Sequence, residues 1–150
     1  MTAAKVPLEI EMGATKRFSM TFTHPLVDEN GELILDGNGQ AQPGDPYNFV
    51  GATARSEVRI TAKSSDVRLS LTTENGGIIL GNGTPEYPDG SITLVFTDAQ
   101  TDDLGWDAAG QKFVEKSVYD VEVKYPSGDV DRLLEGSVTI SPSVTRGTYE

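Results

Sequence analysis

Apolar and polar residues alternate along most of this chain. Successive side chains of a β-strand point to opposite faces of its sheet, so each alternating segment predicts a strand with one buried and one solvated face. This pattern is typical of antiparallel sheets. The apolar positions of five such segments are Phe18, Met20 and Phe22; Ala54, Val58, Ile60 and Ala62; Val67, Leu69 and Leu71; Ile92, Leu94 and Phe96; and Tyr119, Val121, Val123 and Tyr125.

Short clusters of Gly, Asn, Asp and Pro separate the alternating segments, among them ENGE, DGNGQ, ENGG and PSGD. These residues adopt turn dihedrals readily. Short strands with turns between them predict an all-β chain, built as an antiparallel β-sandwich or a small barrel. We expect at most one short helical turn, within 98–106, capped by Asp98 or Thr101.

The chain has 150 residues, which predicts one domain. We assign residues 1–141 to this domain and residues 142–150 to a C-terminal tail. Residues 28–46 form a hairpin-like excursion whose only apolar part is 33–35. The tail has little hydrophobic content, and we predict that it contacts a neighbouring protein through Pro142, Val144, Thr145, Arg146 and Tyr149.

The formal net charge of −11 affects the choice of partners. Nucleic-acid binding needs a basic face that displaces counterions, and an anionic membrane surface attracts basic segments. We therefore expect neither partner, and read the charge as a source of solubility. No apolar run approaches the roughly 20 residues of a membrane span, and no secretory signal is visible, so we expect synthesis in a cytoplasm.

Residues for catalysis are scarce. The chain has no cysteine and a single histidine, His24, which we interpret as an ordinary residue at the end of a strand. A nucleophile–histidine site or a His/Cys zinc site therefore cannot be assembled within one chain. Asp102, Asp103 and Asp107 surround Trp106 and are the best candidates for a glycosidase pair, but a Trp that anchors a turn explains them better. We predict no enzyme activity and no cofactor.

The DGNGQ segment resembles the opening of a calcium-binding loop. The EF-hand pattern requires a glutamate at the twelfth position, and counting from Asp36 that position is Tyr47. Turn formation therefore explains these residues better than metal binding does.

Residues 118–146, VYDVEVKYPSGDVDRLLEGSVTISPSVTR, carry an ordered motif. Tyr119 and Asp120 lie in a strand, a turn contains Gly128, and Arg132 begins a run that leads to Gly136 and G-x-V-x-[IV]-x-P. This order is similar to the closing motif of small β-sandwich proteins of tailed bacteriophages, close to the baseplate upper protein N-terminal domain family. FVGATARSEVRI, with a turn at Gly51, and GSITLVFTDAQTDDL resemble further segments of that family.

The likeness covers about residues 47–146, and more loosely the opening strand at 15–23. It implies an immunoglobulin-like β-sandwich that serves as a structural component of a tailed-phage virion. The chain would be an adaptor or decoration subunit at the tail, baseplate or neck, present in several copies and bound to other virion proteins or fibres. Two features depart from the family: residues 28–46 are longer than the usual link, and no fibre segment follows the last strand.

The motif residues also allow a physical interpretation. Gly128 suits the positive φ of a tight turn, and Gly136 predicts either a bulge or a close approach of two backbones. A buried Tyr119 hydroxyl needs a hydrogen-bond partner. Asp120 is expected on the opposite face, paired with Arg132 or Lys124.

An alternative function is a carbohydrate-binding module that contacts the host surface. It predicts that Trp106, Tyr87 or Tyr47 are exposed together in one shallow groove, because sugars stack on aromatic rings.

Overall fold

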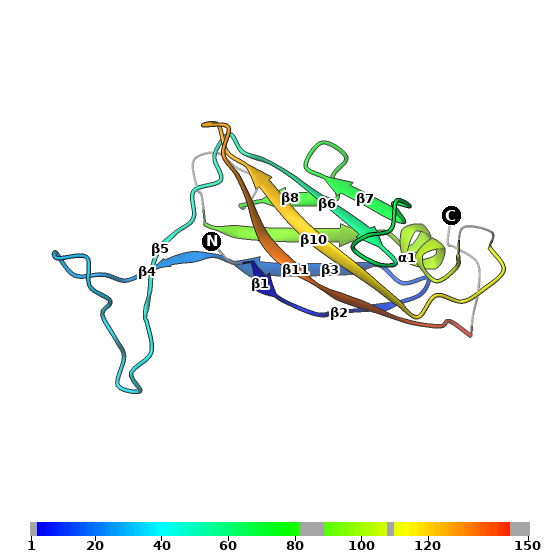
Figure 1. The fold of residues 1–150 in the computed structure, drawn as a ribbon, viewed down its shortest axis with the longest axis horizontal. Coiled ribbons are helices and arrows are strands. Elements are labelled where there is room, and N and C mark those ends of the chain that lie inside the picture. The colour runs from blue at the N-terminus through cyan, green and yellow to red at the C-terminus, as the bar shows by residue number, and fades with distance from the viewer. Residues whose placement is uncertain (1–2, 82–88, 108–109, 145–150) are drawn as a thin grey trace.

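The computed structural model describes residues 3–81, 89–107 and 110–144 and is dominated by β-strands (Figure 1). The predicted all-β class is confirmed. The strands are β1 (Ala4–Lys5), β2 (Leu8–Glu11), β3 (Lys16–Thr21), β4 (Thr23–Pro25), β5 (Pro43–Pro46), β6 (Thr53–Arg59), β7 (Leu69–Thr72), β8 (Ile78–Leu80), β9 (Ser91–Phe96), β10 (Lys116–Lys124) and β11 (Val130–Ser141).

The strands form three sheets. The largest has six strands in the order β1-β11-β10-β6-β7, with β2 also paired to β11. A three-stranded sheet has the order β3-β9-β8, and β4 pairs with β5 alone. Most pairs are antiparallel, as predicted, but β1 and β2 both run parallel to β11. Local alternation does not reveal this parallel pairing, because the partners come from opposite ends of the chain.

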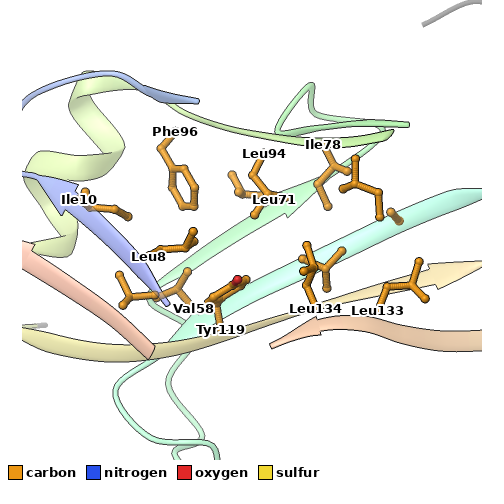
Figure 2. Packing of buried hydrophobic residues seen from close by; sticks show 14 of the residues in the cluster. Leu8, Ile10, Val58, Leu71, Ile78, Leu94, Phe96, Tyr119, Leu133 and Leu134 are labelled. Carbon is orange, nitrogen blue, oxygen red and sulfur yellow. The ribbon is translucent and has the colours of Figure 1, made fainter. Parts of the chain in front are cut away.

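Alternating side chains from the two larger sheets build one hydrophobic core (Figure 2). In β10, Tyr119, Val121 and Val123 are buried between more exposed neighbours. In β9, Ile92, Leu94 and Phe96 are buried in the same alternating manner. Figure 2 shows Leu94 and Phe96 on one side of this core, with Leu8, Tyr119 and Leu134 across from them.

Three of the predicted buried positions, Ile60, Ala62 and Val67, are exposed and lie outside the strands. β6 ends at Arg59, and Ile60 beyond it is 42% exposed, while Val67 before β7 is 43% exposed. The chain reverses between them in a turn in which the Ser64 amide donates to the Thr61 carbonyl. The alternation of apolar and polar residues in the sequence therefore extends beyond the end of β6 and before the start of β7.

The β10–β11 pair is the long hairpin expected from the sequence. Its register shifts because Val121 faces Leu134 while Glu122 faces Arg132. Leu133 is the extra residue of this bulge, and both Leu133 and Leu134 are fully buried. One of the two interpretations of Gly136 had placed the bulge at that residue. The bulge instead lies three residues earlier, at Leu133.

The helix α1 (Asp98–Leu104) occupies the predicted place between β9 and β10, which belong to different sheets. It is seven residues long, more than the single turn expected, and its N-cap is Thr97 rather than Asp98 or Thr101. Thr97 and Gln100 form a capping box. In the ranges described, no helix is long and apolar enough to cross a membrane.

Candidate functional site

The predicted motif residues lie at two places on the six-stranded sheet. Tyr119, Asp120, Arg132 and Gly136 line a hollow of about 650 Å³. Gly51 and Gly128 lie in turns instead, with φ angles of 76° and 94°. These two turns are neighbours, because a Cβ atom on Gly51 would lie 3.0 Å from the Pro126 side chain.

Gly136 marks a close approach of two backbones, as one predicted interpretation held. A Cβ atom at this position would lie 2.2 Å from the Val6 carbonyl oxygen. Tyr119 pairs with Gly136 across the sheet, and its hydroxyl donates to the same Val6 carbonyl over 2.7 Å. The buried hydroxyl therefore has the partner that the sequence required. Burial raises the pKa of the Tyr119 hydroxyl to about 12.

Charged residues form a row across the hollow. Asp120 lies opposite Glu57 on β6 and opposite Glu135 on β11. The Arg132 guanidinium lies 3.4 Å from the carboxylates of both Asp120 and Glu135, so the predicted Asp120–Arg132 pair is confirmed. Burial raises the pKa of Asp120, Arg132 opposes that shift, and the neighbouring carboxylates reinforce it. Arg59 pairs with Glu57 in the same lining over 2.8 Å, so both arginines of the hollow have carboxylate partners.

Of the three candidate carboxylates near Trp106, that of Asp107 serves local structure. The Asp107 carboxylate accepts hydrogen bonds from the Gln111 and Lys112 amides, and these bonds lower its pKa. A glycosidase general acid needs the opposite shift. Among the described residues, no group of three or more His, Asp or Glu side chains is arranged to hold a metal ion.

The structure does not bring the candidate sugar-binding rings together. Trp106 and Tyr47 are half-buried and pack against the core. In Figure 1, α1, which ends just before Trp106, and β5, which ends just before Tyr47, lie at opposite ends of the molecule. Tyr87 lies outside the described residues.

The predicted contact tail is only partly described. Pro142 and Val144 follow β11, and Val144 is fully exposed. Thr145, Arg146 and Tyr149 lie outside the described residues, so the prediction for the tail remains untested.

Residues 23–46 form a projecting arm, of which the sequence predicted only the excursion at 28–46. It extends far from the two larger sheets on the stem formed by β4 and β5 (Figure 1). The predicted excursion at 28–46 is not one hairpin but two, joined to the stem at a three-way junction. There the Leu26 amide donates to Gln42, the Gln42 amide to Ile34, and the Ile34 amide to Leu26, over 2.8, 3.3 and 2.9 Å.

The two small hairpins of the arm are built alike. In the first, the Asp28 carboxylate accepts from the Asn30 and Glu32 amides. In the second, the Asp36 carboxylate accepts from the Asn38 and Gln40 amides. Each turn ends in a glycine with positive φ, 82° at Gly31 and 78° at Gly39. The signal in the sequence was the repeat of D-x-N-G-[EQ] after eight residues, and the aspartates act as turn caps.

The base of the arm is fixed to the body. The Phe22 amide donates to the Gly90 carbonyl, and the Phe22 carbonyl accepts from the Tyr47 amide. The Tyr47 ring stacks on His24 with 4.4 Å between centroids, and lies 5.9 Å from the buried Phe22 ring. His24 is the middle residue of β4, not the last residue of a strand as the sequence predicted. These contacts hold the arm at its root, whereas its outer part has no buried residue.

The outer part of the arm exposes large apolar side chains. Leu33 is 54% exposed, Leu35 51% and Val27 46%, and Leu26 and Ile34 are each 36% exposed. Apolar residues that are exposed together in one cluster indicate an interaction surface, whereas single exposed apolar residues scattered over a protein do not. We therefore regard the projecting arm as the candidate functional site.

No protein-family model matches the chain, and a search of curated proteins finds no match.

Proposed function

We propose that this chain is a structural subunit of a tailed-phage virion, an immunoglobulin-like β-sandwich that binds neighbouring virion proteins or fibres. It would be an adaptor or decoration subunit at the tail, baseplate or neck, made in the host cytoplasm. Two observations support the proposal. The two larger sheets share one core, and the closing β10–β11 hairpin carries the phage-like motif.

The projecting arm carries this proposal. A strand hairpin that buries none of its side chains adds little to the stability of its own domain, because burial of apolar area is the main favourable term in folding. The arm nevertheless has defined turns, a hydrogen-bonded junction and a fixed root. An ordered apolar element held away from the core is suited to fit a partner without a large ordering penalty.

The proposal is tested on particles of the phage whose genome encodes the chain. Mass spectrometry of purified particles should detect the chain, and a particle reconstruction should show its two sheets in several symmetry-related copies. Absence of the chain from purified particles would contradict the proposal.

A matched pair of variants then tests the arm. Residues 27–41 are replaced by Asn-Gly, which joins Leu26 to Gln42 by a two-residue turn suited to a hairpin. The control is Val67→Ser, which changes an apolar residue that is 43% exposed and lies outside both the arm and the C-terminal tail. The shortened chain should remain folded and be lost from particles, whereas the control should be retained. Normal incorporation of the shortened chain would show that the arm is not the contact.

A further inference from the structure

The junction of the projecting arm arranges its apolar residues on one side. Three antiparallel pairs surround it: Pro25 with Pro43, Val27 with Leu33, and Leu35 with Ala41. Members of such a pair share a face of their two-stranded ribbon.

The chain also links one pair to the next across two-residue steps. Extended backbone returns to the same face at every second residue, so Leu33 and Leu35 share a face, as do Pro25 and Val27, and Ala41 and Pro43. All six side chains therefore lie on one side of the junction. We call this the apolar face; its members are Pro25, Val27, Leu33, Leu35, Ala41 and Pro43, and all are exposed.

The opposite side of the junction is different. It carries the three intervening residues, Leu26, Ile34 and Gln42. Leu26 and Ile34 are each only 36% exposed and Gln42 is half-buried. The Gln42 side-chain amide also donates to the Leu35 carbonyl over 3.1 Å. The more exposed and wholly apolar side is the one available for docking.

The charge of the arm selects the kind of partner. Residues 23–46 contain five carboxylates and no lysine or arginine, which gives a formal charge of −5 with His24 neutral. Asp28, Glu32 and Asp36 are each adjacent in sequence to a residue of the apolar face. A surface that covers this face must therefore approach an arm whose net charge is negative.

A second copy of the chain is a poor occupant. It would bring the same carboxylates together, and the chain as a whole carries a net charge of −11. Like charges at an interface oppose association, whereas complementary potentials speed encounter and suppress wrong partners.

We propose that the apolar face binds a different protein, through a surface with an apolar centre ringed by lysine or arginine side chains. This inference rests on the proposed role of the arm in assembly and specifies the chemistry of its partner. Binding should weaken as ionic strength rises, because salt screens the attraction between the carboxylates of the arm and the basic side chains of the partner.

The test uses a random library of short displayed peptides as the probe. Selection on the wild-type chain should enrich peptides that combine apolar residues with Lys or Arg. Leu33→Ser with Leu35→Ser should weaken binding of these peptides about tenfold or more. The matched control, Leu26→Ser with Ile34→Ser, removes similar side chains from the opposite side and should bind within about threefold of wild type.

A third variant tests the charges alone. Asp28→Asn with Glu32→Gln and Asp36→Asn keeps a side-chain oxygen at each turn cap and removes three negative charges. It should bind the peptides more weakly and with a smaller dependence on salt. Circular dichroism and the unfolding midpoint of each variant verify that the fold is retained.

Several results would overturn the inference. These are failure to enrich any peptide, enrichment of peptides without Lys or Arg, equal binding by the Leu33 and Leu35 variant, and self-association of the wild type through the arm in light scattering. Detection of the chain in particles together with any of these results would reject the partner chemistry alone. Peptide binding as expected by a chain that particles lack would instead reject the virion role.

Discussion

The β10–β11 hairpin and the projecting arm contain the same kind of turn, but the first joins the core and the second does not. In both, a glycine amide donates to the carbonyl three residues earlier, from Gly128 to Tyr125 and from Gly31 to Asp28. In both, that glycine has a positive φ. Yet β10 buries every second side chain from Ser117 to Val123, whereas residues 23–41 bury none.

This difference shows that the formation of a turn and the burial of its strands in the core are separate properties, which a sequence pattern does not distinguish. Turn residues determine where a chain reverses, because they fix local dihedrals and hydrogen bonds. Whether the reversed strands join the core depends on contacts with residues far away in sequence. A hairpin with well-formed turns and exposed apolar strands is therefore typical of a surface that binds another molecule.

The sharpest way to test the comparison is the same substitution in both regions. Leu134→Ala removes a fully buried side chain, and we expect it to lower the free energy of unfolding by about 2–5 kcal/mol. Leu33→Ala, at a side chain that is 54% exposed, should change it by less than about 0.5 kcal/mol. Urea unfolding of the two variants measures both values. Similar losses would mean that the arm is part of the cooperative core.

A second pair compares two glycines. Gly136→Ala places a Cβ atom against the Val6 carbonyl, a backbone group that cannot yield as a flexible side chain can, and should destabilise by about 1–3 kcal/mol. Gly37→Ala in the arm meets no atom within 4 Å and should be neutral or slightly stabilising. Thermal unfolding reports both. Unchanged stability of Gly136→Ala would show that β1 and β11 can separate at this point.

Tyr119→Phe tests a single hydrogen bond in the body. It leaves the partly buried Val6 carbonyl without its hydroxyl donor and should lower the free energy of unfolding by about 1 kcal/mol at pH 7. The folded-state pKa of about 12 exceeds the ordinary value of 10, so the folded state holds this proton more tightly. The corresponding stability is complete below pH 10 and is lost as pH rises toward 12.

Urea unfolding between neutral and alkaline pH should therefore show that the free energy of unfolding falls more steeply with pH for the wild type than for Tyr119→Phe. Tyr125→Phe is the control, because burial also raises the pKa of Tyr125 but its ring is only partly covered by the core. An identical alkaline slope for the wild type and Tyr119→Phe would contradict the assignment.

The smallest expected effect on global stability is in the arm. Asp28→Ala removes the carboxylate that accepts from the Asn30 and Glu32 amides, and should leave the free energy of unfolding within about 0.5 kcal/mol of the wild type. Hydrogen exchange at those two amides should accelerate, because the opening is local. Asp28→Asn retains an acceptor oxygen and should stay close to the wild-type rates. A global loss for Asp28→Ala would show that this hairpin unfolds together with the body.

Local pattern was sufficient for much of the fold. The alternation around Leu94 and Val121 predicted β9 and β10, and the turn at Gly128 followed from its neighbours. The parallel pairing of β2 with β11 was not predicted, because no local signal states which distant strand is the partner.

The candidate site was predictable only in part. The aspartate turns were evident at Asp28 and Asp36, but the sequence was interpreted as one hairpin-like excursion. The three-way junction depends on amides and carbonyls at Leu26, Ile34 and Gln42, and backbone groups leave no mark in side-chain composition. The apolar face follows only when the register of all three pairs is known.

The pairing of β1 and β2 with β11 also has a consequence for biosynthesis. A ribosome produces β1 and β2 early, and they must wait for β11 before their hydrogen bonds can form. Contacts between strands so distant in sequence slow folding, and unpaired edges invite wrong pairing in the meantime. The largest sheet is therefore complete only once β11 has been made, and until then β1 and β2 lack the partner with which they pair in the folded protein.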